Sequence, residues 1–154
     1  MDNSATAMTG FQPHPGTGIT AMGEHTRAIS IEGICRAIGM RVEITDPFEL
    51  DSTVAKLLDL IQDEQSGGRV LIMRRECELI RAKKAKAPYK MHVDPDKCLG
   101  DSCGCDRYCT RAFRCTGLYW DEKAGKSKID EVICAGCGYC ANVCPQGAII
   151  REEA

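Results

Sequence analysis

Four cysteines near the carboxyl end of the chain follow a spacing that few folds can accommodate. They lie in the segment Cys134-Ala-Gly-Cys137-Gly-Tyr-Cys140-Ala-Asn-Val-Cys144-Pro. The spacing C-x2-C-x2-C-x3-C-P wraps a cubane [4Fe–4S] cluster, and its first three thiolates cap irons of one cube. Cys144 comes too late to join them easily, and in the two-cluster arrangement it ligates a neighbouring cluster. The motif therefore predicts a second cluster whose other cysteines lie upstream.

Five upstream cysteines are candidates for these ligands, namely Cys98, Cys103, Cys105, Cys109 and Cys115. Aligned from its last cysteine, this less regular motif should supply Cys115 to the cube of Cys134, Cys137 and Cys140. The other cube should be held by Cys144 together with Cys98, Cys109 and either Cys103 or Cys105. The choice between Cys103 and Cys105 stays open, because the segment Gly-Asp-Ser-Cys-Gly-Cys carries one cysteine too many. A chain with a single cluster is the alternative.

A disulfide scaffold or a zinc site would also use many cysteines. Nine of the eleven cysteines lie between Cys98 and Cys144, while residues 1–8 are polar and lack the apolar stretch of a secretory segment. We therefore expect a cytoplasmic protein whose cysteines bind metal. Zinc needs four sulfurs, and it explains neither the evenly spaced Cys140 nor the terminal Cys-Pro.

Charge and hydropathy exclude two classes of partner. The formal net charge is −2, so no strongly basic surface is expected and nucleic acid is not a predicted partner. No run of 18 apolar residues occurs, and no membrane span is predicted. The basic run from Arg81 to Lys86 is interpreted as a solvated linker or a helix end.

Residues 30–75 alternate helix and strand patterns. Ser30 is a predicted N-cap, and Gly39 suits the position that ends the helix. The first helix carries the apolar positions Ile31, Ile34, Cys35 and Ile38. Cys35 is therefore interpreted as a core residue, and Cys77, at a strand end, as a packing residue. A short strand follows at Val42 and Ile44.

A second helix and strand complete a βαβ pattern. Asp51 or Ser52 is the expected cap of this helix, whose apolar face contains Val54, Leu57, Leu58 and Ile61. The continuous apolar run Val70–Met73 is typical of a strand buried in a parallel sheet. Two helices and two or three strands leave a sheet edge and a face uncovered. Residues 1–90 are thus interpreted as the tail of a larger doubly wound domain.

Residues 91–154 are predicted to form a separate cluster domain with little apolar core. Segments 89–93 and 148–150 should pair as short strands, and 118–120 and 128–129 should form a hairpin. Gly136 and Gly138 should let backbone N–H groups approach the cluster sulfurs. Because metal binding and folding are linked, this domain should be largely unfolded without metal.

The N-terminal stretch carries a second signal, Asp2-Asn-Ser-Ala-Thr-Ala-Met-Thr-Gly-Phe-Gln-Pro-His-Pro-Gly-Thr-Gly18. It resembles the closing part of the thiamine-diphosphate site in the alpha subunit of indolepyruvate ferredoxin oxidoreductases. That family continues with two helix–strand pairs, an Arg-Arg-x-Cys segment and a C-terminal two-cluster ferredoxin domain. The order matches this chain from residue 2 to its end, including Arg74-Arg75-Glu76-Cys77. The implied fold is a partial α/β doubly wound thiamine-diphosphate-binding domain (1–90), followed by a small α+β bacterial-ferredoxin-like domain (91–154).

The resemblance also implies roles for matched residues. Asn3 would ligate, through its side chain, the Mg²⁺ that clamps the cofactor diphosphate, and Ala5 would ligate it through its carbonyl oxygen. Thr9 and Gly10, with the segment 14–18, would lie over the cofactor. His14 is assigned no catalytic role and equally suits fixing the loop. The family's Gly-Asp-Gly-like segment, which supplies another Mg²⁺ ligand, should precede Asp2 by about 25–30 residues and is absent from this sequence.

The implied function is oxidative and CoA-dependent. In the family, electrons pass from the thiamine-bound intermediate of an arylpyruvate or other 2-oxo acid through [4Fe–4S] clusters to ferredoxin. We expect this chain to be a fragment or split subunit of such an enzyme, incomplete for catalysis by itself. It would bind two [4Fe–4S] clusters, and thiamine diphosphate with Mg²⁺ only when the missing N-terminal part completes the site. Its partners would be the rest of the alpha subunit or a beta subunit. The alternative is a stand-alone ferredoxin-like carrier or accessory subunit with a vestigial N-terminal domain.

Overall fold

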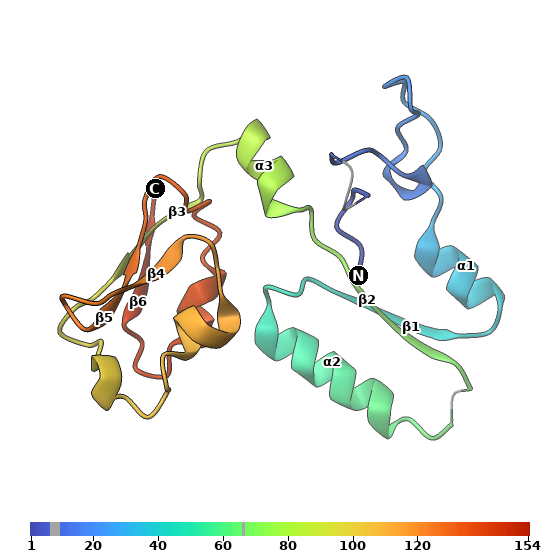
Figure 1. The fold of residues 1–154 in the computed structure, drawn as a ribbon. Coiled ribbons are helices and arrows are strands. Elements are labelled where there is room, and N and C mark those ends of the chain that lie inside the picture. Colours follow the sequence, from blue (N-terminus) through green and yellow to red (C-terminus); the bar gives the residue numbers. More distant parts are fainter. Residues whose placement is uncertain (7–9, 66) are drawn as a thin grey trace. The chain divides into compact units, whose positions relative to one another are not determined.

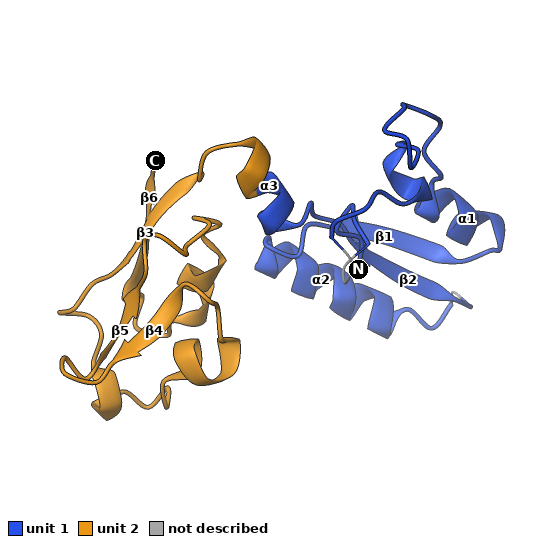
Figure 2. Cartoon of the chain, turned by 45° about the horizontal axis from the view of Figure 1, so that its top comes forward, with its two compact units in different colours: residues 1–81 blue, residues 82–154 orange. Residues whose placement is uncertain are grey.

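The computed structural model describes residues 1–6, 10–65 and 67–154. The chain forms two compact units, Met1–Arg81 and Ala82–Ala154 (Figure 2). The sequence suggested a division near residue 90, whereas the units divide inside the helix α3 (Glu78–Lys84). The reason is that strand β3 starts at Tyr89 and pairs with the last strand of the chain. The second unit therefore includes the segment that leads into β3.

The first unit contains the expected βαβ arrangement (Figure 1). Strands β1 (Arg41–Thr45) and β2 (Arg69–Met73) pair in parallel. The helix α2 (Leu50–Gln62) connects them and packs against both strands. A second helix, α1 (Ile31–Ala37), precedes β1, and a short 3₁₀ helix, η1 (Pro15–Thr17), lies in the N-terminal loop. The prediction of a helix–strand–helix–strand order is confirmed.

The start of the chain extends this sheet beyond β2. Asp2 forms a parallel bridge with Arg74. The Asp2 N–H donates to the carbonyl oxygen of Met73 at 2.8 Å, and the Arg75 N–H donates to that of Asp2 at 3.0 Å. The Arg74 N–H donates instead to Thr45, on the β1 side. The end of β2 therefore lies between β1 and the Asp2–Asn3 segment.

Both ends of α1 follow the sequence prediction. The Ser30 hydroxyl accepts a hydrogen bond from the Gly33 N–H at 2.9 Å, which satisfies one of the free donors at a helix start. Gly39 has a φ of 82°, and its N–H donates to Arg36 while the Met40 N–H donates to Cys35. This pair of bonds is a Schellman motif, for which glycine is favoured because it adopts positive φ without steric cost.

The expected cap of α2 is wrong. The helix begins at Leu50, with Glu49 at the cap position and no side-chain capping bond, so Asp51 and Ser52 lie inside its first turn. The preceding turn sets this start, because the Asp46 carboxylate accepts the Phe48 N–H at 2.9 Å. The Thr53 hydroxyl then donates to the Asp46 carbonyl at 2.9 Å. Hydrogen bonds to the turn thus outweigh the local capping preference.

The apolar faces of both helices in the first unit are largely exposed. The exposed apolar side chains of α1 and α2, with the cap of α1, include Ile34, Ile38, Val54, Leu57, Leu58 and Ile61. Within α2 the buried residues are Thr53 and Leu60. Cys35 and Cys77 are half-buried, so Cys35 is less enclosed than a core position. This exposure agrees with the expectation that residues 1–90 leave a face uncovered.

The second unit contains two small antiparallel sheets. β3 (Tyr89–Val93) pairs with β6 (Ile149–Glu153), and β4 (Leu118–Asp121) forms a hairpin with β5 (Lys126–Ile129). Both pairings were predicted. Three short helical turns lie among the cysteine motifs: η2 (Gly100–Ser102), the π-helical η3 (Cys109–Phe113) and the 3₁₀ helix η4 (Tyr139–Val143).

Cysteines occupy much of the interior of the second unit. Its buried core cluster is small and consists of Met91, Leu118, Cys140 and Ile149. Among the half-buried residues packed against this cluster are Cys109, Cys115, Cys134 and Cys144. Positions that an ordinary small domain would fill with aliphatic side chains therefore carry thiols.

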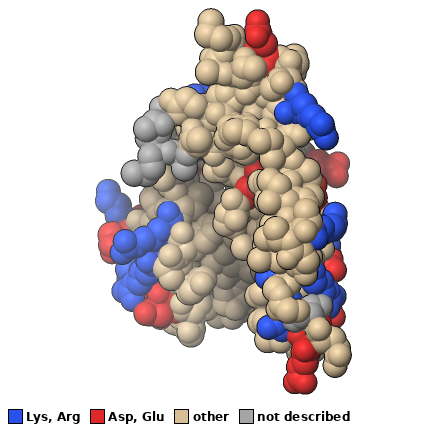
Figure 3. Space-filling model, turned by 90° about the vertical axis from the view of Figure 1, so that its right-hand side faces the viewer, with Lys and Arg blue, Asp and Glu red and all other residues tan. Residues whose placement is uncertain are grey.

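Two features of the surface and the helices bear on charge and hydropathy. Figure 3 shows one face, on which basic and acidic side chains are interspersed and no large area has a single sign. Among the described residues, no helix is long and apolar enough to cross a membrane.

We expect Gly136→Ala to destabilise the protein more than Gly147→Ala. Both glycines have positive φ, 64° and 60°, so each substitution costs about 1–2 kcal/mol in backbone strain. A Cβ at Gly136 would also overlap the carbonyl oxygen of Tyr89, whereas nothing lies within 4 Å of one at Gly147. The clash should add at least about 1 kcal/mol. Urea unfolding of the anaerobically purified variants measures both losses, and equal losses would contradict the prediction.

Candidate metal centres

A cavity in the second unit is lined by cysteines from both sequence motifs. Its cysteines are Cys98, Cys103, Cys105, Cys109 and Cys144. The first four belong to the upstream motif and Cys144 to the downstream one. Much of the remaining wall is apolar, including Val93, Trp120 and Ile149. Such a wall limits solvent access to the sulfurs.

Local hydrogen bonds position two of these sulfurs. The Cys144 Sγ accepts the N–H of Ala148 at 3.3 Å. The Cys109 Sγ lies 3.0 Å from the hydroxyl of Ser127, a buried residue of β5. The sequence indicated neither Ala148 nor Ser127 as a partner of these sulfurs. Ser127 has the sequence context of an ordinary hairpin residue. Its alternation with the exposed Lys128 was the available signal for an inward-pointing hydroxyl.

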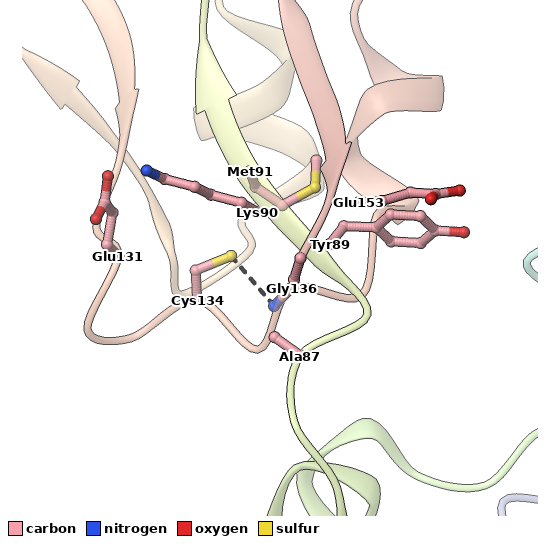
Figure 4. A pocket seen from close by; sticks show the side chains of 9 residues that line it. Ala87, Tyr89, Lys90, Met91, Glu131, Cys134, Gly136 and Glu153 are labelled. Carbon is pink, nitrogen blue, oxygen red and sulfur yellow. Dashed lines mark hydrogen bonds between the residues drawn. The ribbon is translucent and has the colours of Figure 1, made fainter.

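Three other cysteines lie near Cys140 and form a second group with it. Burial, followed by the neighbouring thiols of Cys137, Cys115 and Cys134, raises the pKa of the Cys140 thiol to about 12. Cys115 comes from the upstream motif, so it lies among the three closely spaced cysteines of the downstream one. The Cys134 Sγ accepts the Gly136 N–H at 3.4 Å, as expected for Gly136 (Figure 4).

The short helices η3 and η4 connect the two groups. Cys109 begins η3 and lines the first cavity, whereas Cys115 follows η3 and belongs to the second group. Cys140, within η4, belongs to the second group, and Cys144, the residue after η4, lines the first cavity. The rings of Phe113 in η3 and Tyr139 in η4 stack with centroids 5.8 Å apart. Each helix, with its flanking residues, thus contributes one sulfur to each group.

A single metal ion and a [4Fe–4S] cube need different arrangements of sulfurs. Within residues 1–6, 10–65 and 67–154, no three His, Cys, Asp or Glu side chains are close enough together to hold one metal ion. A zinc site would need four ligands at about 2.0–2.3 Å from a single centre. In a cube each thiolate binds a different iron atom, so its sulfurs lie further apart.

A positive charge also lines the first cavity. The guanidinium of Arg107 lies over the Trp120 ring, 3.9 Å from its centroid. Asp101 accepts its Nε–H at 2.6 Å, and this hydrogen bond lowers the pKa of Asp101. The sequence did not indicate Arg107, because its stacking partner lies in a different element and no local pattern marks it.

The N-terminal residues expected to bind a cofactor are only partly described. The Asn3 Oδ1 accepts the N–H of the buried Ala5 at 3.2 Å, so both residues lie in one tight turn. Gly10 is exposed, with a φ of 107°. Thr9 lies outside the described residues. His14 fixes its loop, because its Nδ1 accepts the Gly16 N–H at 3.1 Å and caps η1.

An arginine clamp holds the segment that carries Asn3. Arg74 pairs with the carboxylates of Asp2 and Glu32, each at 2.8 Å. Its hydrogen bond lowers the pKa of Glu32 to about 2. Burial raises the pKa of Asp2, but the hydrogen bonds from Arg74 and from the Ser4 N–H lower it. The net result is a lowered pKa. The Asp2–Asn3 segment is therefore fixed against the end of β2.

Comparison with known proteins shows what this chain is similar to. A family model described as a 4Fe-4S binding domain matches residues 127–150, which include the downstream motif. The indolepyruvate oxidoreductase subunits IorA of Pyrococcus horikoshii and Pyrococcus abyssi are each 39% identical over 99% of this chain. That of Thermococcus kodakarensis is 39% identical over 94% of it. No solved structure matches.

These relatives confirm the resemblance found in the sequence. The chain is similar over nearly its whole length to part of proteins named as indolepyruvate oxidoreductase subunits. It spans 23% of the length of the two Pyrococcus proteins and 22% of the Thermococcus one. The match at residues 127–150 indicates [4Fe–4S] binding.

Proposed function

We propose that this chain is the electron-relay part of an indolepyruvate-type 2-oxoacid ferredoxin oxidoreductase and that it binds two [4Fe–4S] clusters. One observation carries the proposal: within one small unit, each of the two motifs contributes cysteines to both groups. A single cluster would use the cysteines of only one of these two groups. Eleven cysteines with no disulfide among the described ones suit a reducing compartment, for which we propose the cytoplasm.

The first cluster would be bound by Cys98, Cys109, Cys144 and one of Cys103 and Cys105. The Ser127 hydroxyl and the Ala148 N–H would donate to the thiolates of Cys109 and Cys144. Such hydrogen bonds tune the reduction potential of a cluster. Arg107 would add a positive charge at the cavity wall, which favours the more negative, reduced state.

The second cluster would be bound by Cys115, Cys134, Cys137 and Cys140. Thiolates are the form that binds iron, so these residues must release their protons on loading. Burial and the neighbouring thiols raise the pKa of Cys140, so iron binding would have to remove this proton against both effects. The Gly136 N–H would then donate to the Cys134 thiolate, as it does to the sulfur in Figure 4.

The spacing of the ligands suits electron transfer between the two sites. Cys140 lies in the 3₁₀ helix η4 and Cys144 is four residues further on, so a rise of about 2 Å per residue separates them by about 8 Å along the axis. Cys109 begins the π-helical η3, and Cys115 lies two residues beyond its end. The clusters would supply one-electron transfer, and ferredoxin is the proposed final acceptor.

The first unit would contribute one side of a thiamine-diphosphate site. When bound, that cofactor with Mg²⁺ would supply the decarboxylation of a 2-oxo acid such as an arylpyruvate, with coenzyme A as acyl acceptor. Asn3 and Ala5 fit the Mg²⁺ role, because both offer hard oxygen donors. The bond from the Ala5 N–H uses one of the two lone pairs of the Asn3 amide oxygen. Thr9 and Gly10 would lie next to the cofactor.

The rest of such a site must come from further polypeptide, which is either the remainder of a longer alpha subunit or a second (beta) subunit. The apolar stripe Val54, Leu57, Leu58 and Ile61 supports this, because these side chains are 43–62% exposed. A contiguous apolar surface of this kind is typical of an interface. This chain spans 23% of the relatives named IorA from Pyrococcus, and their extra length is consistent with such a partner segment.

Cys137→Ser should remove one cluster. Anaerobically purified protein should contain about eight irons per chain, since each cube holds four, and the variant about four. Cys35→Ser is the matched control, because this half-buried thiol lies in the first unit, which contains neither cysteine group. It should retain about eight irons. Stoichiometric zinc in a colourless protein, or iron loss in the control, would contradict the assignment.

Adding the missing part should restore catalysis. A polypeptide with the remaining three quarters of a relative, mixed with this chain, should show CoA-dependent oxidation of arylpyruvate with reduction of ferredoxin. Leu58→Glu should abolish this activity, because it places a charge on the exposed stripe, while iron content stays at about eight. If the chain instead exchanges electrons with redox partners and gains no activity on mixing, the stand-alone carrier is the correct function.

Arg107→Gln should lower the reduction potential of the first cluster, by tens of millivolts in order of magnitude. Arg107→Lys should keep most of the potential, because it retains the charge. Arg111→Gln is a matched control, since Arg111 is exposed, pairs with Asp106 and does not line the cavity. Redox titration followed by electron paramagnetic resonance separates the two clusters. An equal shift in the Arg107 and Arg111 variants would reject a specific effect.

A further inference from the structure

The first cavity has one thiol more than a cluster requires. Five cysteine residues line it, while a [4Fe–4S] cube takes four thiolates. Cys98, Cys109 and Cys144 come from three separate segments of the unit. Cys103 and Cys105 enter from the same segment, Cys103-Gly104-Cys105. The extra thiol is therefore either Cys103 or Cys105.

Several contacts anchor the residues around this pair. The Cys98 N–H donates to the carbonyl oxygen of Asp94 at 3.0 Å. Cys109 and Cys144 have the sulfur contacts with Ser127 and Ala148 described above. Among the described residues, no hydrogen bond reaches the sulfur of Cys103 or Cys105. Neither member of the pair is singled out by a polar partner.

The connection between Cys103 and Cys105 permits small movements. Their Cα atoms are two residues apart, which limits their separation to about 7 Å. Gly104 is exposed, and nothing lies within 4 Å of the position that a Cβ would take there. Cys103 is buried and Cys105 is half-buried, yet both reach the same cavity wall. Backbone hydrogen bonds hold both residues, Cys103 N–H to Gly100 and Tyr108 N–H to Cys105, so both thiols stay at this wall of the cavity.

We propose that Cys103 and Cys105 are alternative ligands of the same iron in the first cluster. This inference rests on the proposed two-cluster function. In an exchange, one Fe–S(Cys) bond breaks and another forms on the same iron. The incoming thiol gives up its proton and the outgoing thiolate takes one, so no oxidation state changes. The unbound thiol stays beside the cube and can bind again.

Single and double substitutions test the proposal. Cys103→Ala and Cys105→Ala, each purified anaerobically, should both retain about eight irons per chain. The double variant should fall to about four irons, or to a three-iron cluster with its own paramagnetic signal. Cys109→Ala is the matched control for an obligatory ligand and should lose the first cluster by itself. Iron loss in one single variant and not the other would show a unique ligand and overturn the proposal, as would loss in both.

Alkylation of the folded, cluster-loaded protein gives a second readout that needs no variant. Iodoacetamide followed by peptide mass spectrometry should divide its label between Cys103 and Cys105 while sparing Cys109 and Cys144. Label confined to one of the pair would overturn the exchange. About four irons in the unmodified chain would instead reject the two-cluster function itself, so the two failures are distinguishable.

Discussion

The exchange of cysteines between two groups is the constraint on which the second unit depends. The upstream motif places Cys115 in the second group and the downstream motif places Cys144 in the first cavity, and the Phe113–Tyr139 stack joins η3 and η4. The buried core beside them is small, and a unit of this size gains little from apolar burial alone. Bonds from thiolate to iron would then contribute much of the folding free energy, because binding and folding are coupled.

The first unit is held by different interactions. Its sheet is short, and Arg74 ties the chain start to α1 by pairing with Asp2 and Glu32. Arg75 acts similarly on the next turn, by pairing with Asp46 and stacking over Phe48 at 3.8 Å. These polar ties keep the Asp2–Asn3 turn in place although the helix faces nearby remain exposed. Ion pairs therefore fix the edge of the sheet, while the apolar helix faces stay exposed. Such faces are suited to pack against further polypeptide.

Local signals in the sequence were enough to predict most of the fold. Ser30 and Gly39 marked the ends of α1, and short apolar segments marked both antiparallel pairings. The start of α2 was missed because Asp46 accepts hydrogen bonds from both Phe48 and Thr53, which no propensity of the expected caps reveals. The exchanged grouping of cysteines was expected from spacing, but Arg107 and Ser127 were not. Both act through contacts with residues distant in sequence, which a local pattern cannot show.

The irregular segment 98–107 is better explained as a fixed part of the first site than as a loose insertion. Gly100 packs so closely that a Cβ there would overlap the carbonyl oxygen of Gly125 in the β4–β5 loop. Arg107, at the other end, stacks on Trp120 of β4 and adopts a left-handed φ of 56°, a strained conformation that the stack and the Asp101 pair stabilise. The hairpin thus anchors both ends of the segment. Gly104, between the two cysteines, is exposed and has nothing within 4 Å of the position that a Cβ would take, so the open space in this segment lies between the two alternative ligands.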